Sequence, residues 1–136
     1  MHALYRMTLC RGEDRSFPIT LVFRNPETGV REATEITGRR FLLTVRSEPE
    51  GEVLARLSTD DGSIVLGKMV DRDFMVVDEG EEATTFLIQF THDITEKLIG
   101  KKMVYDIFVM SGEGPDELRQ CLMAGEVKAM ASACYG

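Results

Sequence analysis

Short stretches in which apolar and polar residues alternate recur along this chain, and they restrict its possible folds more than any other feature. Alternate side chains of a β-strand point to opposite faces of a sheet, so each stretch predicts a strand with one buried face. The clearest stretch runs from Phe17 to Phe23, where every second residue is apolar. The alternation predicts further strands at Tyr5–Leu9, Phe41–Val45, Phe86–Phe90 and Met103–Val109.

Weaker strand candidates and turn residues fill the intervals between these stretches. The candidates are Val53–Leu57, Ile64–Leu66, Phe74–Val77 and Leu118–Val127. Turn-favouring residues occur at Asn25–Gly29, Asp61–Gly62, Glu79–Gly80 and Ser111–Pro115. No amphipathic helical segment separates the strands, which disfavours a βαβ arrangement. The pattern therefore predicts an all-β fold of about 7–9 strands, an antiparallel β-sandwich or a barrel.

One short helix is predicted between Asp93 and Gly100. Asp93 would cap its first turn, and Glu96 would complete a capping box. Ile94 and Leu98 are four residues apart, so both would face the core. We expect the whole chain, residues 1–136, to form one domain, with residues 1–4 and 129–136 as tails that are flexible or ordered by a partner.

The charge and apolar content of the chain argue against two classes of partner. The formal net charge is −7, which would repel the phosphate backbone of a nucleic acid. No apolar stretch approaches the roughly 20 residues that a membrane-spanning helix needs. Residues 1–14 contain Arg6, Arg11 and Glu13, so they lack the unbroken apolar region of a secretion signal. We therefore expect no nucleic-acid partner, no membrane, and a protein that stays where it is made.

The residues of common catalytic and metal sites are sparse or badly spaced. His92 is the realistic candidate for a histidine-centred site, and no Gly-x-Ser-x-Gly elbow is present. The spacing of Cys and His residues does not fit zinc. Paired carboxylates fall in turns, where Asp is favoured for its local hydrogen bonds. The sequence predicts no enzyme, no catalytic residue, no cofactor and no metal site.

Three cysteines, an odd number with no Cys-x-x-Cys pair, predict reduced thiols and leave one possible disulfide open. Cys10, Cys121 and Cys134 are far apart in the sequence. A bridge between Cys10 and Cys121 would require the first and last strands to lie side by side with suitable Cα separation.

A series of short pieces, in order from Phe17 to Val127, carries a family resemblance. The pieces are Phe17–Phe23 with the Asn25–Gly29 turn, Ile36–Gly38 leading into Phe41–Arg46, Leu57–Ile64, Tyr105–Ile107 and Ala124–Val127. With them the chain resembles the immunoglobulin-like proteins and domains of tailed-bacteriophage virions, and is similar to the N-terminal domain of baseplate upper proteins. Gly100 followed by Tyr105 looks like the tyrosine corner of such a sandwich.

The resemblance implies an immunoglobulin-like sandwich that serves as a structural component of the virion, in the tail, baseplate, neck or capsid surface. Such a component is made and assembled in the host cytoplasm and ends in the virion. Its partners are other virion structural proteins and further copies of itself. The alternative is a carbohydrate- or host-surface-binding module, although a chain with no Trp and three Tyr offers few rings for sugar stacking.

The residues expected at an interface combine exposed rings with an acidic run. The segment from Met69 to Glu82 does not match the family pattern, so we interpret it as a candidate for a protein-specific contact. Its acidic run is a solvated loop on the simplest interpretation, with a docking or calcium patch as the alternative. The candidate interface residues are Tyr5, Phe74, Glu79, Glu81, Glu82 and Tyr135.

Overall fold

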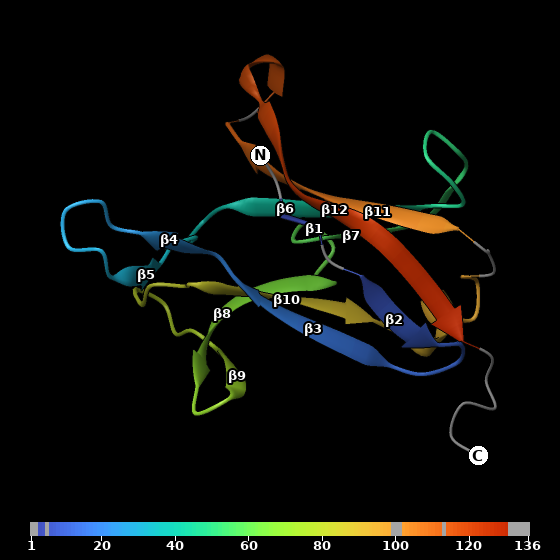
Figure 1. Ribbon diagram of the computed structural model, residues 1–136, viewed down its shortest axis with the longest axis horizontal. Helices are drawn as coiled ribbons and strands as arrows, with labels where there is room; N and C mark the ends of the chain where they lie inside the picture. The colour runs from blue at the N-terminus through green and yellow to red at the C-terminus, as the bar shows by residue number, and fades with distance from the viewer. Residues whose placement is uncertain (1–2, 5, 99–101, 113, 131–136) are drawn as a thin grey trace.

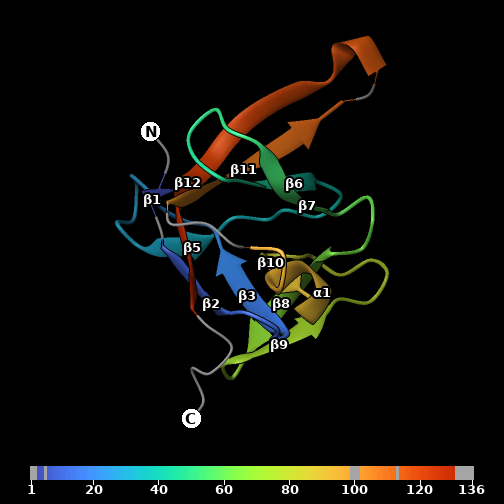
Figure 2. The same cartoon turned by 90° about the vertical axis from the view of Figure 1, so that its right-hand side faces the viewer.

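The computed structural model describes residues 3–4, 6–98, 102–112 and 114–130. These residues form a mostly β structure with one short α-helix, in which two sheets lie one above the other (Figures 1 and 2). The larger sheet contains β1 (Ala3–Leu4), β2 (Met7–Cys10), β6 (Arg40–Arg46), β7 (Val53–Ser58), β11 (Met103–Ser111) and β12 (Leu118–Met130). The smaller sheet contains β3 (Arg15–Thr20), β8 (Ile64–Val70), β9 (Asp73–Val76) and β10 (Thr85–Phe90).

A separate hairpin, β4 (Val22–Arg24) with β5 (Arg31–Ala33), extends from one end of the molecule (Figure 1). A short 3-10 helix, η1 (Gly114–Asp116), lies in the turn between β11 and β12. The described residues thus contain 12 strands, more than the 7–9 expected. Three strands were not predicted separately: β1, β4 and β5. The predicted Phe17–Phe23 strand is divided into β3 and β4, because the chain leaves the smaller sheet after Thr20 and pairs with β5 instead.

The larger sheet has the order β1-β12-β11-β6-β7, and β2 pairs with β12 on the same side as β1. Both β1 and β2 run parallel to β12, which corrects the expectation of a wholly antiparallel fold. A parallel pair needs a long crossover rather than a tight turn. Here most of the domain lies between β2 and β12, and it supplies that crossover.

The smaller sheet has the order β3-β10-β8-β9, and all of its pairs are antiparallel. One hydrophobic core lies between the two sheets. Phe41 of β6 stacks on Phe86 of β10, with ring centroids 4.4 Å apart and planes 16° apart. The edge of one ring meets the face of another where Phe17 packs against Phe90. The alternation therefore identified the buried faces of β6 and β10 correctly.

Helix α1 (His92–Thr95) follows β10 and is shorter than predicted. Asp93 does not cap it: Thr91 is the N-cap residue, without a side-chain cap hydrogen bond. Instead, the His92 backbone N–H donates to Asp14 Oδ1 at 2.7 Å, so the cap comes from the β2–β3 turn. The acceptor for the His92 N–H comes from a segment far away in the sequence, and capping rules that consider only neighbouring residues cannot predict it. Leu98 is fully buried and Ile94 packs against the core, as predicted, while Gly100 lies outside the described residues.

Cys121 is a free thiol, so it forms no bridge with Cys10. The register explains this result, because Cys10 lies opposite Met130 rather than Cys121. Nine residues of strand separate Cys121 from Met130, which is a distance of about 30 Å. Cys10 is nevertheless disulfide-bonded, which corrects the expectation of reduced thiols. Among the helices described, none is long and apolar enough to cross a membrane.

Candidate interaction surfaces

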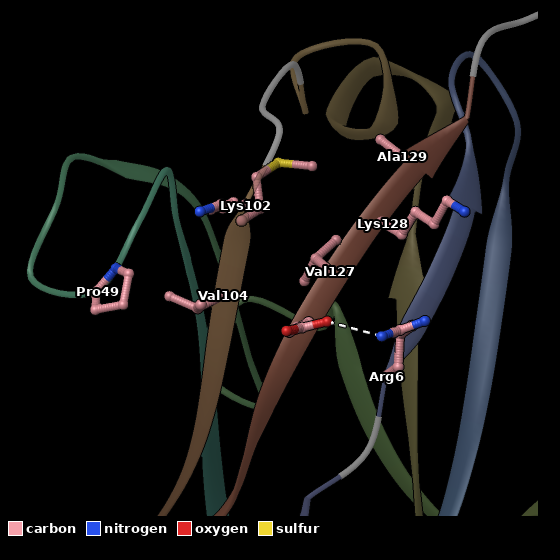
Figure 3. Close-up of a pocket in the computed structure, with 9 residues that line it drawn as sticks. Arg6, Pro49, Lys102, Val104, Val127, Lys128 and Ala129 are labelled. Atoms are coloured by element: carbon pink, nitrogen blue, oxygen red, sulfur yellow. Dashed lines mark hydrogen bonds and ion pairs between the residues drawn. The ribbon is translucent and has the colours of Figure 1, made fainter.

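A groove opens on the outer face of the larger sheet, with a volume of about 690 Å³ (Figure 3). Its cations are Arg6, Lys102 and Lys128, and we call the depression that they line the cationic groove. The other residues that line it are Pro49, Met103, Val104, Glu126, Val127 and Ala129. Glu126 and Lys128 are two residues apart on β12, so their side chains share the outer face while Val127 between them is buried.

The cationic groove carries surplus positive charge. Arg6 and Glu126 form an ion pair at 3.0 Å (Figure 3). Neither Lys102 nor Lys128 has an ion-pair partner among the residues that the structure describes. Three cations and one carboxylate therefore leave two net positive charges, on a chain whose formal net charge is −7. This arrangement favours an anionic occupant.

A second hollow, of about 720 Å³, continues along the same face and includes Asp106 and Arg46. The Oδ1 atom of Asp106 is buried and has no hydrogen-bond partner among the described residues. Burial raises the pKa of Asp106, and the nearby charge of Arg46 opposes that rise. Burial, and next the charge of Asp106, raise the pKa of the Cys121 thiol. The thiol is therefore held in its protonated form, which is the less nucleophilic one.

The acidic loop, residues 78–82, connects β9 to β10 and contains three of the predicted interface residues. Glu81 pairs with Lys68 at 2.6 Å, and this hydrogen bond lowers the pKa of Glu81 and raises that of Lys68. Glu79 and Glu82 are exposed, and neither has an ion pair within the described part of the chain. Glu81 thus stabilises the loop through its contact with Lys68, while the carboxylates of Glu79 and Glu82 are exposed to solvent.

Calcium binding was the other interpretation of the acidic loop. Within the described residues, no group of three or more His, Cys, Asp or Glu side chains lies close enough to hold a metal ion.

The β8–β9 hairpin carries Phe74 and several exposed apolar residues. Phe74 is half-buried, because its ring covers Gly67: a Cβ atom on Gly67 would lie 2.5 Å from Phe74 Cζ. Met69, Val70, Met75 and Val76 are exposed, with Val76 at 67%. We call these four residues the apolar hairpin patch. All four lie in the segment from Met69 to Glu82 that the sequence indicated as a candidate contact, although they were not among the individual candidate residues. The adjacent pairs Met69-Val70 and Met75-Val76 break the alternation and put apolar groups on both faces.

The remaining predicted residues have other placements. Tyr5 and Tyr135 lie outside the described residues. His92 is exposed, and its Nδ1 atom lies 3.1 Å from Asp14 Oδ1. The hydrogen bond with Asp14 is the largest cause of a raised pKa at His92, and the hydrogen bonds from His92 lower the pKa of Asp14. His92 therefore ties helix α1 to the β2–β3 turn.

The described residues define a mostly β protein whose notable surface features are a cationic groove, an acidic loop and an apolar hairpin patch. Neither the protein-family models nor the curated protein sequences that we compared with this chain match it.

Proposed function

We propose that this chain is an assembly or docking module of a tailed-bacteriophage virion, in its tail, baseplate, neck or capsid surface. The observation that carries the proposal is the exposure of apolar side chains on two hairpins, β8–β9 and β4–β5. On β4–β5 and its turn, Val22, Phe23 and Val30 are 55%, 47% and 55% exposed. Grouped exposed apolar residues mark contact surfaces in proteins.

Strand order supports an immunoglobulin-like sandwich as the scaffold of this module. The order β12-β11-β6-β7 corresponds to the G-F-C-C′ order of a variable-type immunoglobulin sheet. The facing order β3-β10-β8 corresponds to B-E-D. Tyr105, the candidate for a tyrosine corner, is 2% exposed on β11, the strand that corresponds to F.

Burial of the β8–β9 hairpin by a partner would stabilise the assembled state. Full burial of one Val or Met side chain contributes about 1.5–3 kcal/mol. A partner that covers Met75 and Val76 would therefore gain a substantial part of the free energy of docking. The partners in this proposal are other virion structural proteins and further copies of the chain, without nucleic acid or membrane.

Co-assembly with virion proteins from the same genome, followed by electron microscopy, tests the proposal. We expect the wild-type chain on particles and about tenfold or greater loss of occupancy when Met75→Asp and Val76→Asp are combined. Leu118→Asp is the matched control, because Leu118 is 71% exposed on another hairpin. A chain that stays monomeric in every mixture would contradict the proposal.

A carbohydrate-binding role has one observation in its favour. A hollow of about 410 Å³ on the larger sheet is lined by Arg46, Arg56 and Arg119 together with Phe108. Arginine forks with one aromatic ring suit an acidic sugar. Saturable binding on a glycan array, abolished by Arg56→Ala, would favour this second role.

A further inference from the structure

The cationic groove and the acidic loop carry opposite charges on one chain. The groove holds Lys102 and Lys128 without ion-pair partners among the described residues. The loop presents Glu79 and Glu82, likewise exposed and unpaired within that part of the chain. Each surface therefore offers the charge that the other lacks.

The acidic loop is held in a defined conformation. The Glu81 backbone N–H donates to the Asp78 carbonyl at 3.0 Å and closes a turn, in which Gly80 has a φ of 89°. Lys68 holds Glu81 from the neighbouring strand at 2.6 Å. Because the loop is already ordered, little conformational entropy is lost when it binds a partner.

The two surfaces lie at opposite ends of the molecule. Figure 1 shows the loop between β9 and β10 at the left, toward the end of the molecule from which the β4–β5 hairpin extends. The groove is lined by residues of the β6–β7 turn, the start of β11 and the end of β12, and these segments lie at the right in Figure 1. The loop therefore cannot reach the groove of its own chain. A contact between two different surfaces of identical copies is heterologous, and it produces a ring or an open filament.

Resting on the assembly role proposed above, we infer that the cationic groove of one copy binds the acidic loop of the next copy, in a head-to-tail contact. Lys102 and Lys128 pair with the exposed glutamates of the incoming loop. Val104 and Pro49 line the groove beside them and exclude water from the contact.

The net charge of the chain argues for this specific orientation. Copies that each carry −7 repel one another in most orientations. Placing the acidic loop of one copy against the groove of another converts the local repulsion into attraction, which fixes the register of the contact.

A reciprocal charge exchange tests the inference. One variant combines Lys102→Glu with Lys128→Glu, and the other combines Glu79→Lys with Glu82→Lys. Each variant alone places like charges at the contact, so we expect self-association more than about tenfold weaker than that of wild type. In an equimolar mixture, the acidic loop of the first variant fits the basic groove of the second, and the reversed loop fits the reversed groove. Sedimentation velocity should therefore show association of the mixture alone.

Two further measurements sharpen the test. Wild-type association should weaken between low and physiological salt, because exposed charges are screened. Arg15→Glu with Lys97→Glu makes the same change in net charge as the groove variant, at exposed positions that line neither the groove nor the acidic loop, and it should leave association unchanged. A mixture of the two reciprocal variants that stays monomeric would overturn the inference, as would a monomeric wild type at low salt and high concentration.

Failure of the inference and failure of the assembly role give different results. A wild-type chain that is monomeric alone but still joins virion proteins would overturn the head-to-tail contact and leave the assembly role standing. Retention of monomeric wild type on an acidic polysaccharide, lost in the groove variant, would overturn the contact in favour of a glycan occupant.

Discussion

At the scale of single residues, the stacked pair Phe41 and Phe86 joins the two sheets, since each ring is 0% exposed and comes from a different sheet. Phe86→Ala removes a buried ring and leaves a cavity, which lowers the free energy of unfolding by about 3–5 kcal/mol. Urea denaturation followed by circular dichroism measures the loss. Phe23→Ala, at a position 47% exposed, is the control and should change stability much less. Equal effects of the two substitutions would contradict a core between the sheets.

The contact between Asp14 and His92 makes a pH-dependent contribution to stability. The pKa of His92 is raised above its ordinary 6.5, so its contribution is complete below that value and is lost as pH rises through the folded-state pKa. The pKa of Asp14 is lowered from 3.8, so its contribution is present above that value and is lost as pH falls through the lowered pKa. The contact therefore supports the fold best between these two ordinary values.

Asp14→Asn tests this contact directly. The substitution removes the negative charge and keeps an oxygen that can accept the His92 backbone N–H, so we expect the pKa of His92 to fall toward its ordinary value. NMR titration of the His92 ring measures the change. Asp116→Asn, in the turn between β11 and β12, is the control and should leave the titration of His92 unaltered. An unaltered titration in Asp14→Asn would show that the contact does not form.

At the scale of elements, the β8–β9 hairpin depends on the absence of a side chain at one position. A Cβ atom on Gly67 would lie 2.2 Å from the Met75 carbonyl oxygen and 2.5 Å from the Phe74 ring. Gly67→Ala therefore forces β9 away from β8, at a cost of about 1–3 kcal/mol. Hydrogen exchange should show faster opening of β9 with little change in β11. Unchanged protection of β9 would contradict the close approach.

Elements with uninterrupted alternation were predictable from the sequence, and those that depend on distant partners were not. The strands β6, β10 and β11 follow from local pattern, because residues such as Phe41, Ile88 and Ile107 alternate with partly exposed neighbours. The β4–β5 hairpin and the parallel pairing of β2 with β12 depend on which strands meet, which alternation does not encode.

The same distinction applies to the candidate surfaces. The acidic loop is continuous in sequence, so its charge was evident from residues 78–82. Arg6, Lys102 and Lys128 come from three separate segments, and only the pairing of β12 with β11 and with the N-terminal strands assembles them. No local signal in the sequence could have indicated the groove.

At the scale of the whole molecule, the position of β12 has a consequence for the time course of folding. This strand, the last in order of synthesis among those described, lies inside the larger sheet, between β11 on one side and β1 and β2 on the other. During synthesis on the ribosome, β1, β2 and β11 therefore lack β12 as their pairing partner until residues 118–130 emerge. Sheets closed by such distant segments fold in about milliseconds to seconds. Stopped-flow refolding should fall in this range, and a truncation before Leu118 should remain unfolded.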